Sequence, residues 1–115
     1  MAKNQLYPEN KHIAIVADKD YASGQPAAIG AYRGVVLADA AEGDEVTVWL
    51  NGSYSIDVAG ALTVGQVVYL DNSGKLTATV GTNVVWGVAN VAKATGTSPA
   101  EVAPFGMIQP APPAA

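Results

Sequence analysis

The sequence predicts an all-β fold, either a small β-sandwich or a β-barrel, in a single domain. Valine, isoleucine, threonine and tyrosine cluster in short runs, and 12 glycines separate these runs. No amphipathic pattern with the 3.6-residue period of a helix lasts beyond two turns. The chain has 115 residues, which is enough for one domain with its own core but not for two.

Strands are expected at spacings near ten residues, which suit a sandwich or a small barrel. The expected strands, in chain order, cover residues 12–17, 27–29, 33–38, 45–50, 53–58, 66–70, 75–80, 83–91 and 101–108. Residues 12–108 therefore form the predicted β domain. Residues 1–11 form a polar N-terminal arm, and the Pro/Ala-rich residues 109–115 form an extended C-terminal tail.

The dipeptide Asn51-Gly52 predicts a tight β-hairpin. A type I′ turn needs positive φ at both central residues, and Asn-Gly is the pair that adopts it most readily. The two strands on either side would then pair directly, with Leu50 opposite Ser53 and Trp49 opposite Tyr54.

The tetrapeptide at residues 71–74, Asp-Asn-Ser-Gly, predicts a second turn. Gly74 suits the left-handed position that follows a type I turn. This geometry would bring Asp71 close to Lys75 and return the chain as a hairpin.

The predicted strands are apolar on both faces, which indicates burial inside the fold or against another subunit. In so small a chain we favour oligomerisation, although a barrel that tolerates isolated surface apolar residues is the alternative. The large aromatic residues are the candidates for the core or an oligomer interface: Trp49, Tyr54, Tyr69 and Trp86. A platform of these rings for stacking on sugars is a second interpretation.

A repeated pattern indicates two related β units. The segment from Gly34-Val35-Val36 to Glu45-Val46 is similar to the segment from Gly87-Val88-Ala89 to Glu101-Val102.

The composition argues against several classes of protein. The formal net charge is -4, and the six lysines and arginines are scattered, so the clustered cations that bind nucleic acid are missing. No apolar run approaches the length of a membrane helix, and the polar start of the chain lacks a signal-peptide pattern, so we expect a protein used without secretion or membrane insertion. The chain has no cysteine, which removes disulfides and thiolate chemistry.

The sequence carries no motif for catalysis or for binding a cofactor. His12 is the only histidine, and no Gly-x-Ser-x-Gly nucleophile motif accompanies it. The carboxylates of Asp39, Glu42, Asp44 and Glu45 cluster in one loop rather than on two facing walls, which favours a solvated turn over a glycosidase site. The loop lacks the spacing of an EF-hand, which leaves only an irregular, weak calcium site as an alternative. We therefore predict a protein that is not an enzyme and that needs no cofactor or metal.

An ordered set of motifs resembles the capsid cement, or head decoration, proteins of tailed bacteriophages over nearly the whole chain. The set begins with Ser23-Gly24 and Ala27-Ala28-Ile29-Gly30. It continues with residues 34–40 (GVVLADA), 42–48 (EGDEVTV), Asn51-Gly52, 65–71 (GQVVYLD), 74–77 (GKLT) and 86–89 (WGVA). The Pro/Ala-rich tail and the loop at residues 93–99 depart from the family pattern.

This resemblance implies a small, tulip-like β protein without catalytic activity that binds the outside of the expanded phage head. It implies a virion location on the outer surface of the head, with synthesis in the cytoplasm of the host bacterium. The implied partners are the major capsid protein and further copies of the chain, as a homotrimer. A carbohydrate-binding or adhesion module displayed on a virion or cell surface is the alternative function. For contact with the shell we nominate the end of the N-terminal arm: Leu6, Tyr7, Pro8, Glu9, Asn10 and Lys11.

Overall fold

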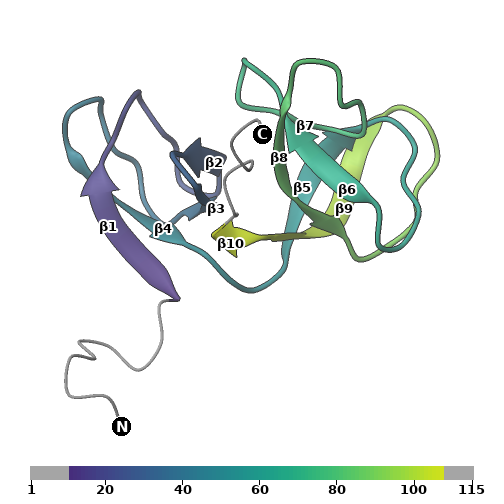
Figure 1. Ribbon diagram of the computed structural model, residues 1–115, viewed down its shortest axis with the longest axis horizontal. Helices are drawn as coiled ribbons and strands as arrows, with labels where there is room; N and C mark the ends of the chain where they lie inside the picture. Colours follow the sequence, from purple (N-terminus) through teal and green to yellow (C-terminus); the bar gives the residue numbers. More distant parts are fainter. Residues whose placement is uncertain (1–10, 108–115) are drawn as a thin grey trace, which may run out of the picture.

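The computed structural model describes residues 11–107 and contains only β-strands as regular structure in that range (Figure 1). The predicted all-β class is therefore confirmed. The strands are β1 (His12–Val16), β2 (Pro26–Ile29), β3 (Tyr32–Val36), β4 (Glu45–Trp49), β5 (Tyr54–Ala59), β6 (Val67–Leu70), β7 (Leu76–Thr77), β8 (Val84–Ala89), β9 (Thr97–Pro104) and β10 (Gly106–Met107).

The strands form two units that lie side by side in Figure 1. The first unit, which we call the N-terminal sheet, has the order β1-β4-β3-β10, with β2 also paired to β3. The second unit is a closed barrel of β5, β7, β6, β8 and β9. The chain crosses from the sheet to the barrel between β4 and β5 and returns through β10, which pairs with β3.

The N-terminal sheet and the barrel repeat one four-strand unit, in which β1, β2, β3 and β4 correspond to β5, β6, β8 and β9. Each unit contains an isolated antiparallel bridge, followed by a turn with the sequence Gly-Gln that is bonded to the third strand. The bridges are Tyr21–Ala40 and Leu62–Lys93, and the turn bonds are Gly24 N to Val36 O, Val36 N to Gln25 O, Gly65 N to Ala89 O and Ala89 N to Gln66 O.

Two glycines occupy the same place in the two units. A Cβ atom on Gly34 would overlap the carbonyl oxygen of Trp49 in β4, and one on Gly87 would overlap that of Ala103 in β9. The predicted relation between two β units is therefore confirmed at these glycines. Further along the chain, the predicted alignment is wrong by two residues. It matched Val102 with Val46, but Val102 pairs with the third strand of its unit in the same way as Val48 does.

The two units differ in strand β7. In the barrel, β7 pairs in parallel with β5 and antiparallel with β6, which closes the ring. In the N-terminal sheet, β2 and β3 are joined directly at Gly30, which has φ +57°, and no described strand stands in the position of β7. The N-terminal sheet therefore remains open where the barrel is closed.

The predicted hairpin at Asn51-Gly52 is wrong. Strand β4 pairs with β1 and β3, whereas β5 pairs with β9 and β7. Only glycines have positive φ among the described residues, so Asn51 cannot occupy the first position of a type I′ turn. Gly52 alone is left-handed, with φ +91°, and Tyr54 Oη donates a 2.8 Å hydrogen bond to Asn51 O. The segment is the crossover from the sheet to the barrel.

The predicted turn at residues 71–74 is confirmed. Gly74 has φ +83°, and Leu70 in β6 pairs with Leu76 in β7. Asp71 Oδ1 accepts 2.9 Å hydrogen bonds from the backbone nitrogens of Ser73 and Lys75. These bonds hold the pKa of Asp71 below its usual value, the bond from Lys75 contributing most.

Several predicted strand limits need correction. The strand expected at residues 75–80 comprises only Leu76–Thr77, because the chain is already turning toward β8 at Val80. The last long strand begins at Thr97 rather than at residue 101, so the loop at 93–99 is partly a strand. The end expected at residue 108 lies outside the described residues.

Each unit has its own apolar core, and the two are bonded to each other. The core of the N-terminal sheet contains Val36, Val46 and Val48, while that of the barrel is centred on Trp86. Arg33, which is buried, donates from Nε to Val85 O at 2.5 Å and from Nη1 to Gly30 O at 2.6 Å. Burial away from water lowers the pKa of this guanidinium. The sheet and the barrel are therefore held together by buried, directional bonds.

Candidate functional site

Of the four aromatic candidates, Trp86 lies in the core of the barrel. Its side chain is 0 % exposed, and its Nε1 donates a 3.2 Å hydrogen bond to Gly34 O in the N-terminal sheet. The indole is therefore unavailable to a ligand or to another subunit.

The other three aromatic residues are partly buried and lie in different strands. Trp49 in β4 contacts His12 in β1, with ring centroids 4.8 Å apart and planes tilted by 49°. Tyr54 packs against the barrel core, and burial raises its pKa. Tyr69 lies in β6, opposite Thr77 and Val85. The structure thus distributes these rings over both units, and with Trp86 buried they do not form one stacking platform.

Of the nominated shell-contact residues, Lys11 is the one that the structure describes. Leu6, Tyr7, Pro8, Glu9 and Asn10 are outside the described residues. Lys11 is exposed, and its carbonyl oxygen accepts a 2.7 Å hydrogen bond from Leu50 N. This bond fixes where the chain enters β1.

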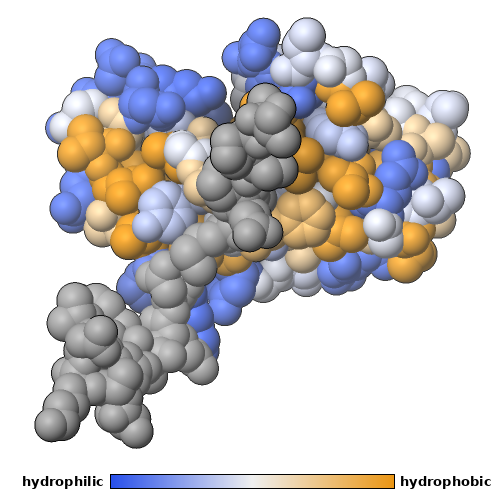
Figure 2. All heavy atoms as spheres, viewed as in Figure 1, coloured by the Kyte–Doolittle hydropathy of each residue, from blue (hydrophilic) through white to orange (hydrophobic). Residues whose placement is uncertain are grey.

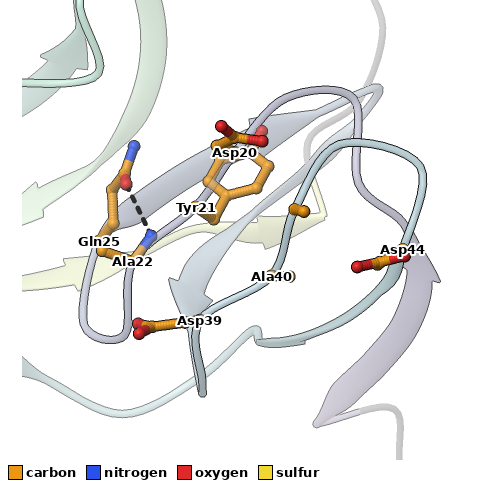
Figure 3. Close-up of a pocket in the computed structure, with 8 residues that line it drawn as sticks. Asp20, Tyr21, Ala22, Gln25, Asp39, Ala40 and Asp44 are labelled. Atoms are coloured by element: carbon orange, nitrogen blue, oxygen red, sulfur yellow. Dashed lines mark hydrogen bonds between the residues drawn. The ribbon is translucent and has the colours of Figure 1, made fainter.

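Acidic residues gather at one end of the N-terminal sheet, in two loops that are bonded to each other. Ser23 N donates to Asp39 Oδ1 at 2.8 Å, and Glu42 N donates to Asp20 Oδ1 at 2.8 Å. The loops enclose a shallow depression, and Figure 3 shows the carboxylates of Asp20, Asp39 and Asp44 around it. The sequence predicted one acidic loop at 39–45; the structure adds the acidic residues of the loop at 18–20.

Tyr21 forms the floor of this depression and ties the acidic end to the core. Its ring is buried in the core of the N-terminal sheet, and its Oη donates a 2.5 Å hydrogen bond to Asp18 Oδ1. Burial, and then the Asp18 carboxylate, raise the pKa of Tyr21 well above its usual value. The phenol therefore stays protonated and acts as a donor to the acidic loop. Within residues 11–107, no three acidic or histidine side chains converge in a way that could hold a metal ion.

One exposed feature that the sequence missed is the outer face of β1 and β4, which we call the outer β1–β4 face. Its residues are paired across the two strands, since His12 lies opposite Trp49, Ala14 opposite Thr47 and Val16 opposite Glu45. Leu37 extends it, because Leu37 N donates to Thr47 O at 2.9 Å. Val16 is 67 % exposed and Leu37 is 55 % exposed.

This face combines the exposed apolar side chains of Ala14, Val16 and Leu37 with three polar ones, His12, Thr47 and Glu45. Apolar side chains are visible around β1 in Figure 2. The sequence analysis paired Trp49 with Tyr54, which placed β4 beside the wrong strand, so the row of exposed residues along β1 was not recognised. The alternation of Ile13 and Ile15 with His12, Ala14 and Val16 was the signal that could have found it, because side chains in a strand point to opposite faces in turn.

A family model described as phage cement protein matches residues 7–104. The chain belongs to the phage cement protein family. A comparison with curated proteins gives no match.

Membership of the phage cement protein family gives this chain a structural role in association with the phage capsid. The matched range includes β1 to β9 and the crossover between the two units, so the family pattern covers both units except β10. A structural role agrees with the prediction of a non-enzyme made from the absence of catalytic motifs. No helix among residues 11–107 is long and apolar enough to cross a membrane.

Proposed function

We propose that this cement protein binds the exterior of the expanded phage head and stabilises the capsid lattice, acting as a homotrimer that contacts the major capsid protein. The protein is made in the host cytoplasm, where heads assemble, and reaches the virion by binding the outer surface of the head. The observation that carries the proposal is the family match over residues 7–104.

The fold supports a role in stabilising the capsid lattice. Both units have apolar cores, and bonds from Trp86 and Arg33 join them, so force applied to one unit is transmitted to the other. Many modest contacts repeated over a symmetric lattice give strong total binding without any single tight site.

The charge of the protein also suits this role. A net charge of -4 gives the chain no tendency to bind DNA, so we propose no nucleic-acid partner.

Co-sedimentation with phage heads tests the proposal. Purified protein is mixed with expanded, undecorated heads, and with unexpanded procapsids as the matched control. Saturable binding to expanded heads alone is the expected result, with a stoichiometry that gives the copies per shell. Absence of binding to both shells would reject a head-binding cement function.

Deletion of residues 1–10 tests the proposed role of the arm. We propose that Leu6 to Lys11 contact the shell, so the truncated protein should keep the melting temperature of the full chain and bind expanded heads more weakly. Binding at full strength by the truncated protein would remove the arm from the contact.

Light scattering on both proteins gives the mass in solution, and a mass of one chain before and after head binding would contradict the homotrimer.

A further inference from the structure

The repeated unit provides an internal comparison for the outer β1–β4 face. Strands β1 and β4 of the N-terminal sheet correspond to β5 and β9 of the barrel, so each residue of the face has a counterpart on the barrel. The pairings fix these counterparts: Val16 opposite Glu45 matches Asp57 opposite Pro99, and Ala14 opposite Thr47 matches Ser55 opposite Glu101.

The two corresponding faces differ in polarity. Leu37 N donates to Thr47 O as Asn90 N donates to Glu101 O, so Leu37 corresponds to Asn90. At four matched positions the barrel carries polar side chains where the N-terminal sheet carries apolar or less polar ones, whereas Glu45 corresponds to the apolar Pro99. The matched residues are Ala14 with Ser55, Val16 with Asp57, Leu37 with Asn90 and Thr47 with Glu101.

The barrel face has the character of a surface in contact with water. Asn90 Nδ2 donates a 3.0 Å hydrogen bond to Glu101 Oε2, and Ser55, Asp57, Asn90 and Glu101 are all exposed. The same backbone geometry therefore folds well with polar residues at these positions. The apolar residues of the outer β1–β4 face are not required by the fold, and their exposure indicates a partner that covers them.

The acidic loops limit the chemistry of that partner. Val16 and Leu37 are followed in the chain by Asp18 and Asp39, and Val16 lies opposite Glu45. The barrel has uncharged residues at the corresponding positions. The matched residues are Asp18 with Ala59, Asp20 with Ala61, Asp39 with Ala92, Asp44 with Ser98 and Glu45 with Pro99. An apolar face bordered by carboxylates fits an apolar patch bordered by lysine or arginine.

Three of the five cations within residues 11–107 of a second copy are already engaged and do not border such a patch. The six lysines and arginines are dispersed along the sequence. Arg33 is buried, Lys19 lies within the acidic loops over the ring of Tyr21, and Lys93 donates to the carbonyl oxygens of Ala94 and Gly96.

We propose that the outer β1–β4 face is the surface that docks on the capsid shell, against an apolar patch of the major capsid protein with basic groups around it. This inference rests on the proposed head-binding function. It is continuous with the proposed arm contact, because Leu6 to Lys11 directly precede β1 in the chain. The barrel face of β5 and β9 then stays in contact with solvent.

Substitutions that copy the barrel provide the test. The variant V16D/L37N places on the sheet the residues that the barrel carries at Asp57 and Asn90. Val64→Asp is the matched control, because Val64 is 70 % exposed in a turn of the barrel and receives the same charge. For each protein we measure binding to expanded heads by co-sedimentation, mass by light scattering and melting temperature.

We expect V16D/L37N to lose at least about tenfold in affinity for heads, which corresponds to about 1.4 kcal/mol. Its mass and melting temperature should equal those of wild type. The V64D control should bind heads as wild type does. Wild-type affinity for V16D/L37N would overturn the proposal. A lower mass for this variant would also overturn it, by assigning the face to contacts between copies. Failure of the wild-type protein to bind heads would instead reject the proposed function together with this surface.

The charged border is tested separately by salt. Head binding by wild type should weaken as salt is added, and D44N/E45Q should show a smaller dependence on salt at unchanged melting temperature. An identical salt dependence for both proteins would remove basic groups from the description of the partner.

Discussion

The indole Nε1 of Trp86 donates a hydrogen bond to the carbonyl oxygen of Gly34 at 3.2 Å, which joins the core of the barrel to the third strand of the N-terminal sheet. Gly34 itself has no room for a side chain, because β4 lies against it. The two residues are 52 positions apart in the chain. Their contact makes the stability of each β unit depend on the other.

Replacement of Trp86 by alanine should destabilise the protein by about 3–5 kcal/mol, because it leaves a large cavity in the barrel core. Trp86→Phe keeps most of the volume and removes the donor to Gly34 O, so it should cost less. Trp49→Ala is the matched control, since Trp49 is only partly buried. Thermal or urea unfolding measures all three, and an equal loss for W86A and W49A would contradict the assignment of Trp86 to the core.

Replacement of Gly34 or Gly87 by alanine should destabilise the protein by about 1–3 kcal/mol or prevent folding, because the new Cβ overlaps a carbonyl oxygen of the neighbouring strand. Gly43→Ala is the comparison, since Gly43 has φ +90° but open space around it. That change introduces backbone strain only, of about 1 kcal/mol. Unfolding curves in which G43A is the least stable of the three variants would argue against the close approach.

Arg33 should be needed for the junction between the two units. Arg33→Ala removes the donors to the carbonyl oxygens of Val85, Gly30 and Tyr32, and should cost about 3 kcal/mol because buried acceptors lose their partner. Arg33→Lys keeps the charge but cannot donate in the same directions, so it should recover only part of this loss. Full recovery of unfolding stability by R33K would show that charge, and not geometry, is what matters.

Asp71 should make stability depend on pH in the acidic range. Its pKa is lower in the folded protein than in the unfolded chain, so its contribution is fully present above the unfolded pKa of about 4 and is lost as pH falls through the folded pKa. Asp71→Asn retains an oxygen acceptor but removes the charge. The difference in unfolding free energy between wild type and D71N should therefore shrink below about pH 4. A difference that is constant from pH 3 to pH 7 would be inconsistent with this.

The all-β class and the turn at residues 71–74 could be predicted because both depend on local chemistry. Gly74 takes the left-handed conformation that the turn needs, and Asp71 caps it with its own side chain. The crossover at Asn51-Gly52 could not be predicted in the same way. Asn51-Gly52 has the local preference for a type I′ turn, but β4 finds its partners in β1 and β3, and burial of Leu50 in the sheet core outweighs the preference.

The candidate surface was only partly predictable for the same reason. The acidic loop at 39–45 was evident from composition, but the loop at 18–20 joins it only through bonds such as Glu42 N to Asp20 Oδ1. Exposure of Val16 depends on which side of β1 faces the core, and that side is set by the pairing with β4. Likewise Trp86 was recognised as a core or interface residue, while its burial depends on closure of the barrel by β7.

The pairing of β10 with β3 has a consequence for biosynthesis. Met107 lies opposite Tyr32, so the first sheet of the protein is completed by a strand that the ribosome delivers 75 residues after Tyr32. Contacts between residues so distant in the chain form slowly, and until they form the edge of β3 exposes unpaired backbone groups. We therefore expect the sheet to reach its final form only after translation has passed Met107, so that an incomplete chain is not yet competent for assembly.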